Sequence, residues 1–303
     1  MRVLITGGAG FIGSALAKAL RPLYEVRVLD DFHRGQSPPE GVEVIRGSVL
    51  EWRTLEWAMR DVDILIHAAA IAGVGTVVNK PYQTLKVNLT GTQMVLDAMS
   101  ACARHVIFFS TSEVYGPRCY KASETDATVQ GPLDQPRWVY ATSKVAGEHL
   151  VSGYCVEADI PYTIIRPFNV YGPGQLGEGA IHWFVKNALA GKPLTVHGDG
   201  TPIRSWCYIS DCIDTVVSAV DNPKAYDQVF NVGNPYATMS TLNLAETVLR
   251  LTGSDSEIRF AEISYPEIDI RVPDISKSVL LLGNTPKVGL DDGLRWTIQG
   301  SRV

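Results

Sequence analysis

The glycine-rich turn near the start of the chain is the feature that most restricts its fold. Residues 2–6 (Arg-Val-Leu-Ile-Thr) have the apolar, partly β-branched composition of a buried strand, and the turn Gly7-Gly-Ala-Gly-Phe-Ile-Gly13 follows directly. Residues 14–20 are good helix formers with an apolar stripe. A strand, a glycine turn and a helix in this order are typical of a dinucleotide-binding unit.

Each part of the turn has an expected role. Gly7 permits the sharp turn, Gly10 lets the backbone approach a pyrophosphate, and Gly13 lets the helix pack close to the strand. The start of the helix, at Phe11 and Ile12, offers free N–H groups and a positive dipole end to the phosphates.

The next predicted strand, residues 25–30, strengthens this interpretation. It ends in Asp30, seventeen residues after Gly13, which is close to the offset of about 20 residues for an acid that binds the adenosine ribose. A carboxylate there repels a 2′-phosphate, so the sequence favours NAD over NADP. Arg34 weakens this preference without reversing it.

Strands and helices alternate through the first half of the chain. Strands are expected at 42–46, 62–67, 106–109 and 162–165, and helices at 50–61, 81–102 (with a break near Gly91) and 138–158, whereas 119–137 is expected to be a loop. This alternation predicts an α/β fold with a doubly wound parallel sheet, a Rossmann fold, and ligands at the carboxyl ends of its strands. Four residues at such ends are expected against the dinucleotide: Ser48 and Val49 near the adenine, and Ala68 and Ala69 where small side chains expose backbone.

Glycine and proline become frequent from Arg166 onward, and the pattern changes. We expect residues 1–165 to form the NAD-binding domain, completed by a strand near 229–232. Residues 166–303 are expected to form mainly a smaller α/β domain that binds the substrate.

Composition excludes several functions. The net charge is −5 and no basic run occurs, so a nucleic-acid partner is not expected. No apolar stretch approaches the ~20 residues of a membrane span, and a strand starting at Arg2 leaves no room for a signal peptide. The five cysteines form no C-x-x-C and the six histidines are scattered, which predicts a cytoplasmic protein with reduced thiols and no metal site.

Tyr140 and Lys144 are the second strong signal. Residues four apart on a helix share one face, so the phenol and the ammonium group are expected side by side. A nearby cation favours the phenolate, which can then take a proton from a sugar hydroxyl while a hydride leaves the same carbon. The Ser110-Thr-Ser-Glu113 segment at the preceding strand end supplies hydroxyls, from Thr111 and Ser112, for the reacting oxygen. Glu113 adds a carboxylate capable of further acid–base chemistry.

Together these motifs resemble the extended short-chain dehydrogenases/reductases that act on nucleotide sugars. The likeness extends over essentially the whole chain, through Arg-Pro-Phe-Asn169, Arg204 ahead of Tyr-Ile-Ser-Asp211, and Arg271-Val-Pro-Asp. It implies a bound NAD that oxidises C4 of the sugar, with Tyr140, Lys144 and Pro167 also contacting that cofactor. It further implies a homodimer formed through the helix at 81–102 and the helix that carries Tyr140. The positions that match substrate-binding ones, in addition to Thr111 and Ser112, are Asn169, Val196, His197, Arg204 and Arg271.

The resemblance leaves three reactions open. Thr111-Ser-Glu113 and Pro136-Arg-Trp-Val-Tyr140 resemble UDP-glucuronate decarboxylases, in which a C4 ketone makes the C6 carboxylate a β-keto acid that loses CO₂. Glu113 and Arg204 would then orient the carboxylate and manage the proton at C5. A C4-epimerase or a 4,6-dehydratase remains the alternative, and a non-catalytic NAD(H)-binding sensor is a remote one.

Overall fold

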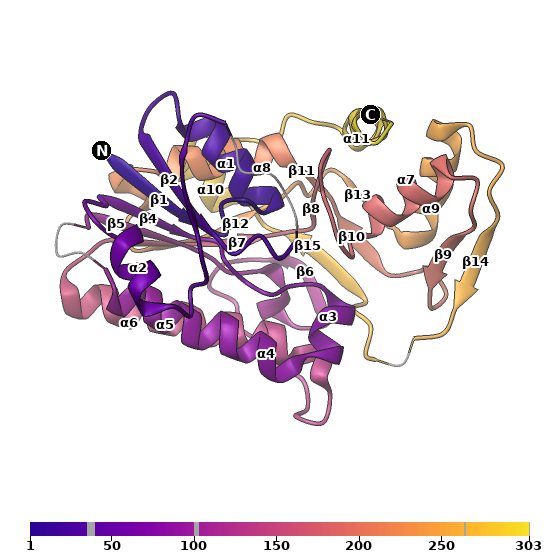
Figure 1. The fold of residues 1–303 in the computed structure, drawn as a ribbon. Helices are drawn as coiled ribbons and strands as arrows, with labels where there is room; N and C mark the ends of the chain where they lie inside the picture. The colour runs from indigo at the N-terminus through magenta and orange to yellow at the C-terminus, as the bar shows by residue number, and fades with distance from the viewer. Residues whose placement is uncertain (35–39, 100–102, 264, 303) are drawn as a thin grey trace.

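A seven-stranded parallel sheet forms the larger of two lobes in the computed structural model, which describes residues 1–34, 40–99, 103–263 and 265–302 (Figure 1). All six neighbouring strand pairs are parallel. The spatial order is β12 (Gln228–Val232), β7 (Tyr162–Pro167), β5 (His105–Phe109), β4 (Ile64–His67), β1 (Arg2–Thr6), β2 (Glu25–Asp30) and β3 (Glu43–Arg46).

Helices cover both faces of this sheet, as Figure 1 shows. One face packs against α1 (Phe11–Leu20), α8 (Ile209–Ala219) and α10 (Ser276–Leu282). The other packs against α2 (Trp52–Ala58), α5 (Gly91–Asp97) and α6 (Val139–Ala158). The predicted doubly wound sheet is therefore confirmed. The central strands β4 and β5 are buried along their whole length and are largely apolar, whereas the edge strand β3 is mostly exposed and begins and ends in a charged residue.

The helix expected at 81–102 is divided into three pieces. They are α4 (Pro81–Leu85), a π-helical turn η1 (Lys86–Thr90) and α5, so the irregular turn comes immediately before Gly91. Residues 100–102, including Cys102, lie outside the described part of the chain.

The smaller lobe is built around a four-stranded sheet in the order β13 (Thr238–Ser240), β10 (Ile203–Ser205), β15 (Ile270–Pro273) and β6 (Arg118–Ala122). Its core lies between α7 (Ala180–Leu189), α9 (Thr241–Thr252) and α11 (Leu290–Gly300). Four short strands pair beside it: β8 (Val170–Tyr171) with β11 (Cys207–Tyr208), and β9 (Leu194–His197) with β14 (Ile258–Ala261).

The expectation of a loop at 119–137 was wrong over its first residues, because β6 lies there. Its only hydrogen-bonded neighbour among the described strands, β15, follows about 150 residues later, so no pattern in the nearby sequence predicts the pairing. The chain also passes repeatedly between the lobes: β6 joins the smaller sheet, whereas α8, β12 and α10 return to the larger one.

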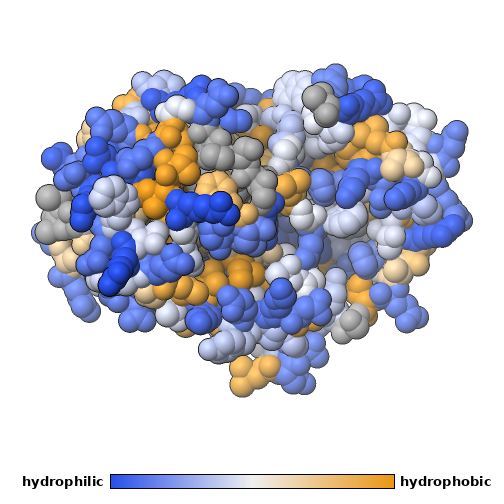
Figure 2. Space-filling model, in the orientation of Figure 1, coloured by the Kyte–Doolittle hydropathy of each residue, from blue (hydrophilic) through white to orange (hydrophobic). Residues whose placement is uncertain are grey.

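The surface is mixed in polarity. Figure 2 shows hydrophilic side chains over most of the visible face, with hydrophobic residues in separate patches. In the described ranges, no helix has both the length and the apolar character needed to cross a membrane.

Candidate active site

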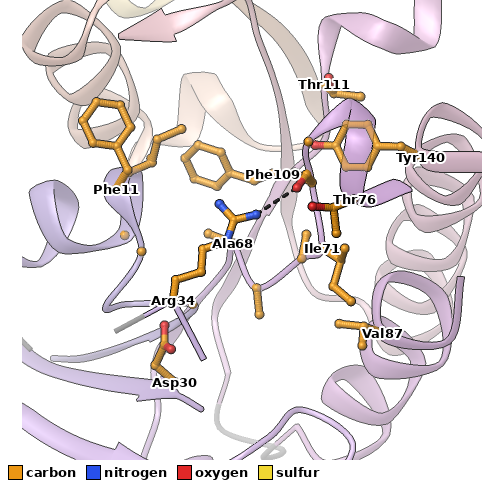
Figure 3. Close-up of a pocket in the computed structure, with 18 of the residues that line it drawn as sticks. Phe11, Asp30, Arg34, Ala68, Ile71, Thr76, Val87, Phe109, Thr111 and Tyr140 are labelled. Carbon is orange, nitrogen blue, oxygen red and sulfur yellow. Dashed lines mark hydrogen bonds between the residues drawn. The ribbon is translucent and has the colours of Figure 1, made fainter. Parts of the chain in front are cut away.

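A cavity of about 910 Å³ opens at the carboxyl ends of the central strands, between the lobes (Figure 3). Nearly all of the residues that the sequence predicts for cofactor and substrate lie on its wall. They are Gly7, Gly10, Phe11, Ile12, Gly13, Asp30, Ser48, Val49, Ala68, Ala69, Thr111, Ser112, Glu113, Tyr140, Lys144, Pro167, Asn169 and Arg271.

The glycine turn has the backbone shape that a dinucleotide requires. Gly7 has a φ of +71°, and a Cβ at Gly13 would overlap the Gly7 carbonyl oxygen. Helix α1 then starts at Phe11. The first N–H groups of this helix have no partner within it, and the residues that carry them, Phe11, Ile12 and Gly13, line the cavity. These features fit the diphosphate of a dinucleotide, which needs both close backbone approach and a helix N-terminus.

Asp30 is fixed at the end of β2 by two backbone donors. Its Oδ2 accepts a hydrogen bond from the Ala9 amide at 3.0 Å, and its Oδ1 accepts one from the Phe32 amide at 2.8 Å. The carboxylate lines the cavity beside the glycine turn, which suits a pair of ribose hydroxyls.

Arg34 does not stay at the Asp30 end of the cavity. Figure 3 shows it extending between Asp30 and the Tyr140 region, and its Nη2 donates a 2.8 Å hydrogen bond to the Ala72 carbonyl. The positive charge of Arg34 partly offsets the increase in the pKa of Tyr140 that burial causes. Its side chain therefore bears on the catalytic end of the cavity, a placement that its sequence position did not suggest.

Tyr140 and Thr111 form the catalytic end of the cavity (Figure 3). Burial is the main cause that raises the pKa of Tyr140, and the negative charge of Glu113 raises it further. A side-chain hydrogen bond with Thr111 and the charge of Arg271 act in the opposite direction. The phenol is accordingly a protonated group in this environment and can serve as a base only when a further positive charge faces it.

Lys144 lies one turn after Tyr140 on α6, but its strongest contact is with the sheet. Its Nζ donates a 2.7 Å hydrogen bond to the Phe109 carbonyl at the end of β5. Burial lowers the pKa of Lys144 to about 7, and the charge of Glu148, one turn further along the helix, partly offsets this effect. The ammonium group is thus held at the strand end that carries Thr111.

Glu113 is enclosed by two arginines. Arg137 donates from Nη1 to Oε2 at 2.7 Å and from Nη2 to Oε1 at 3.1 Å, and Arg271 donates to Oε1 at 3.4 Å. Burial alone would raise the pKa of Glu113, but the charges of Arg137 and Arg271 lower it below its ordinary value. Glu113 is therefore an ionised group.

Sequence reasoning missed Arg137 as a site residue. The signal was present in Pro136-Arg-Trp-Val-Tyr140, because a residue three positions before Tyr140 faces the same side at the start of the helix. The 3₁₀ turn η3 (Pro136–Trp138) places Arg137 there, next to Glu113 of the 3₁₀ turn η2 (Ser112–Tyr115).

A second cavity, of about 250 Å³, adjoins this cluster. Glu113, Arg137, Asn169, Arg204 and Arg271 all line it. Arg204 on β10 is the register partner of Arg271 on β15, so the two cations lie side by side in the smaller sheet. Burial, followed by the charge of Arg271, lowers the pKa of Arg204 to about 10, and the charge of Glu267 partly offsets this shift.

Two predicted substrate residues lie elsewhere. Side chains alternate along β9, so Val196 is fully buried in the core of the smaller lobe, whereas the neighbouring His197 is exposed. Neither residue is on the wall of the two cavities described above.

A parallel sheet with this glycine turn, an acid after β2 and a Tyr-x-x-x-Lys pair at the cavity defines an NAD-dependent enzyme of the short-chain dehydrogenase/reductase type. The NAD dependent epimerase/dehydratase family model matches residues 3–233, and the chain belongs to that family.

Individual relatives are similar over nearly their full lengths or a large part of them. A UDP-N-acetyl-alpha-D-glucosaminuronate decarboxylase from Bacillus cytotoxicus is 36% identical over 99% of this chain and 98% of its own. UDP-glucuronic acid decarboxylase 1 from Xenopus tropicalis is 34% identical over 98% of this chain and 71% of its own. The crystal structure of a UDP-glucuronic acid 4-epimerase from Bacillus cereus, in complex with UDP-glucuronic acid and NAD, matches with a TM-score of 0.90 at 33% identity, covering 100% of this chain and 99% of that one.

Proposed function

We propose that this enzyme decarboxylates a UDP-linked hexuronic acid after transient oxidation at C4. The observation that carries the proposal is the ionised Glu113, held by Arg137 and Arg271 next to Thr111 and Tyr140. A carboxylate and several arginines at the catalytic end suit chemistry beyond hydride transfer. Decarboxylases among the relatives support the same reaction.

The residues that line the larger cavity indicate how NAD would bind. The glycine turn and the N-terminus of α1 would hold the diphosphate of NAD, and Asp30 would hold the adenosine ribose. When bound, NAD supplies the hydride acceptor for the C4 carbinol and the positive nicotinamide ring.

Four side chains would share the remaining work. Tyr140 takes the proton of the C4 hydroxyl, while Lys144 fixes the helix face against the end of β5. Thr111 donates a hydrogen bond to the same oxygen. Loss of CO₂ from the resulting β-keto acid moves negative charge onto that oxygen, where Tyr140 and Thr111 both donate. After CO₂ leaves, C5 takes up a proton from solvent, and Glu113 would orient the water that delivers it.

The arginines would bind the anionic parts of the substrate. Arg204 and Arg271 form a pair of adjacent cations, which suits the diphosphate because each guanidinium donates two parallel hydrogen bonds. Three guanidinium groups, those of Arg137, Arg204 and Arg271, line the second cavity together with the carboxylates of Glu113 and Glu178. Guanidinium groups on the wall favour an anionic ligand over a neutral one.

The experiment that tests this function is incubation of the purified protein with NAD and a panel of UDP-, dTDP- and GDP-sugars, read by mass spectrometry. Loss of one CO₂ from UDP-glucuronate or its 2-acetamido analogue supports decarboxylation. Loss of one water would instead identify a 4,6-dehydratase. An unchanged mass with altered sugar stereochemistry would identify a C4-epimerase, the second candidate, which the Bacillus cereus structure favours.

Glu113→Gln separates the candidates further. Decarboxylation should collapse in this variant because delivery of a proton to C5 loses the carboxylate that directs it, whereas epimerisation should largely survive because it leaves C5 untouched. Tyr140→Phe is the matched control, since it should abolish both reactions.

The proposed assembly is a homodimer in the cytoplasm. The helices α4 and α5 pack beside α6 on one side of the large sheet, and Tyr82 of α4 remains 76% exposed there. The four described cysteines are free and buried, which suits a reducing compartment. Light scattering during size-exclusion chromatography tests the dimer.

A further inference from the structure

The contact between Arg137 and Glu113 has the geometry with which a guanidinium binds a carboxylic acid ligand. Both side chains are largely buried, with 6% and 16% of their surface exposed, and two parallel N–H groups meet the two carboxylate oxygens. Such a bidentate fork is the arrangement that arginine uses to recognise a planar carboxylate. This fork also faces the second cavity.

The position of the fork relative to the reacting carbon is informative. Arg137 comes three residues before Tyr140, whose phenol marks the place of the C4 hydroxyl, and the charge of Glu113 is close enough to raise the pKa of that phenol. In a hexuronic acid, the carboxyl carbon C6 is two bonds from C4. A group that reaches C6 must therefore lie close to Tyr140. Glu113, which Arg137 holds, lines the same cavity as Tyr140.

We infer that Arg137 is the residue that selects a substrate carboxylate, and that it does so by exchanging Glu113 for the C6 carboxylate of the sugar. This inference rests on the proposed function, because it names the group that distinguishes a hexuronic acid from a neutral hexose. Glu113 occupies the fork as an internal stand-in for the substrate group.

The exchange leaves no buried charge without a partner. A carboxylate that loses its only buried partner is strongly destabilised, but Glu113 keeps Arg271, which donates to Oε1 at 3.4 Å. Arg137 stays charged throughout, since a guanidinium does not lose its proton in proteins. A sugar with a neutral hydroxymethyl group at C6 cannot displace Glu113 from Arg137. Arg137 therefore adds nothing to the affinity for such a sugar.

Arg204 provides the matched control. It lines the same cavity, but in the smaller sheet beside Arg271, and its Nη1 donates to the neighbouring Ile203 carbonyl at 3.0 Å. Its proposed target is the diphosphate, which every UDP-sugar carries, in place of the carboxylate that the resemblance to decarboxylases implied for it. Removing Arg204 should weaken all of these ligands alike, whereas removing Arg137 should weaken only those with a carboxylate.

The test is titration calorimetry of the NAD-loaded protein with UDP-glucuronate, UDP-glucose and UDP. Arg137→Met should raise the Kd of UDP-glucuronate roughly 10- to 100-fold, the range expected for lost hydrogen bonds between charged groups, and should change the Kd of UDP-glucose less than about threefold. Arg204→Met should raise all three values together. Glu113→Gln should tighten UDP-glucuronate more than UDP-glucose, because it removes the competitor from the fork.

A purely structural role of Arg137 would not lead Glu113→Gln to tighten the binding of UDP-glucuronate selectively. If Arg137→Met weakens UDP-glucose and UDP as much as UDP-glucuronate, or if Glu113→Gln leaves the preference unchanged, the inference is wrong. The double variant Arg137→Met/Glu113→Gln keeps charge neutral at the fork and guards against a folding defect in the single one. It should also lack the preference for UDP-glucuronate.

Failure of the proposed function has a different signature. In that case the wild-type protein would release no CO₂ from any hexuronate, whatever its binding preference. Selective binding of UDP-glucuronate that depends on Arg137 would then still support carboxylate recognition, in an enzyme that epimerises the same acid.

Discussion

The buried ion pair between Glu148 and Arg166 lies directly behind the catalytic face and gives a quantitative prediction. Arg166 donates from Nε to Oε1 of Glu148 at 2.9 Å and from Nη2 to Oε2 at 2.6 Å, and Ser110 donates to Oε1 at 2.5 Å. The two charged side chains are 10% and 6% exposed. The contacts join α6, β7 and the strand end just before Thr111, so they set the spacing between Lys144 and the sheet.

Glu148→Gln removes the charge while keeping the size of the side chain, so it leaves no cavity. Arg166 is then a buried cation without its counter-ion, because the Tyr115 hydroxyl, which accepts from it at 2.8 Å, is neutral. Removing one member of a buried pair costs about 3–5 kcal/mol. With a urea m-value of about 3 kcal/mol/M for a chain of this size, the unfolding midpoint should fall by roughly 1–1.7 M.

The assay is urea unfolding followed by circular dichroism, for a double-mutant cycle of Glu148→Gln, Arg166→Met and the two together. Because the double variant removes both charges, it should be less destabilised than the sum of the single ones by at least about 2 kcal/mol. Asp291→Asn is the surface control: its pair with Arg250 is 58% and 52% exposed, and its loss should cost less than about 1 kcal/mol. A Glu148→Gln protein within about 1 kcal/mol of wild type would refute the reasoning.

Three further predictions concern the cofactor cavity and its support. Gly13→Ala should abolish NAD binding in a fluorescence titration because its Cβ meets the Gly7 carbonyl, whereas Gly153→Ala, with open space around the new Cβ in α6, should stabilise the protein by about 0.5–1 kcal/mol and bind NAD normally. Asp30→Ala should weaken NAD about 10- to 100-fold through lost charged hydrogen bonds, and NADP less, so equal weakening of both would contradict its proposed role. Burial lowers the pKa of His67 to about 3. Below its ordinary pKa of about 6.5, this imidazole is therefore protonated in the unfolded chain but stays neutral in the native protein. Stability should therefore fall on acidification from about pH 6.5 toward 3, by on the order of 1.4 kcal/mol per pH unit for this group, and His67→Asn should make the urea midpoint less steep in pH.

The parts of the site that were predictable from sequence depend on short-range patterns. The glycine turn, Asp30 and the Tyr140/Lys144 pair each combine a local element with a fixed spacing, and the structure places all of them on one cavity. For Lys144 the structure adds a contact that the spacing did not predict. Its ammonium group meets the Phe109 carbonyl, a backbone atom whose position no spacing rule gives.

The parts that were missed depend on pairings between distant segments. The role of Arg137 depends on its contact with Glu113, 24 residues earlier, and β6 has a strand to pair with only when β15 is in place. Val196 was assigned to the substrate through a motif position, but the alternation of β9 turns its side chain into the core.

The placement of β6 also sets an order in which the site can be assembled during synthesis. Two neighbouring strands of the smaller sheet, β10 and β15, must pair before Arg204 and Arg271 lie side by side, and β15, which also pairs with β6, ends only at Pro273. The glycine turn, Asp30 and Tyr140 all leave the ribosome much earlier. A growing chain therefore contains its dinucleotide-binding residues long before it contains the arginine pair proposed for the substrate diphosphate. A chain truncated before β15 would leave β6 without the strand with which it pairs.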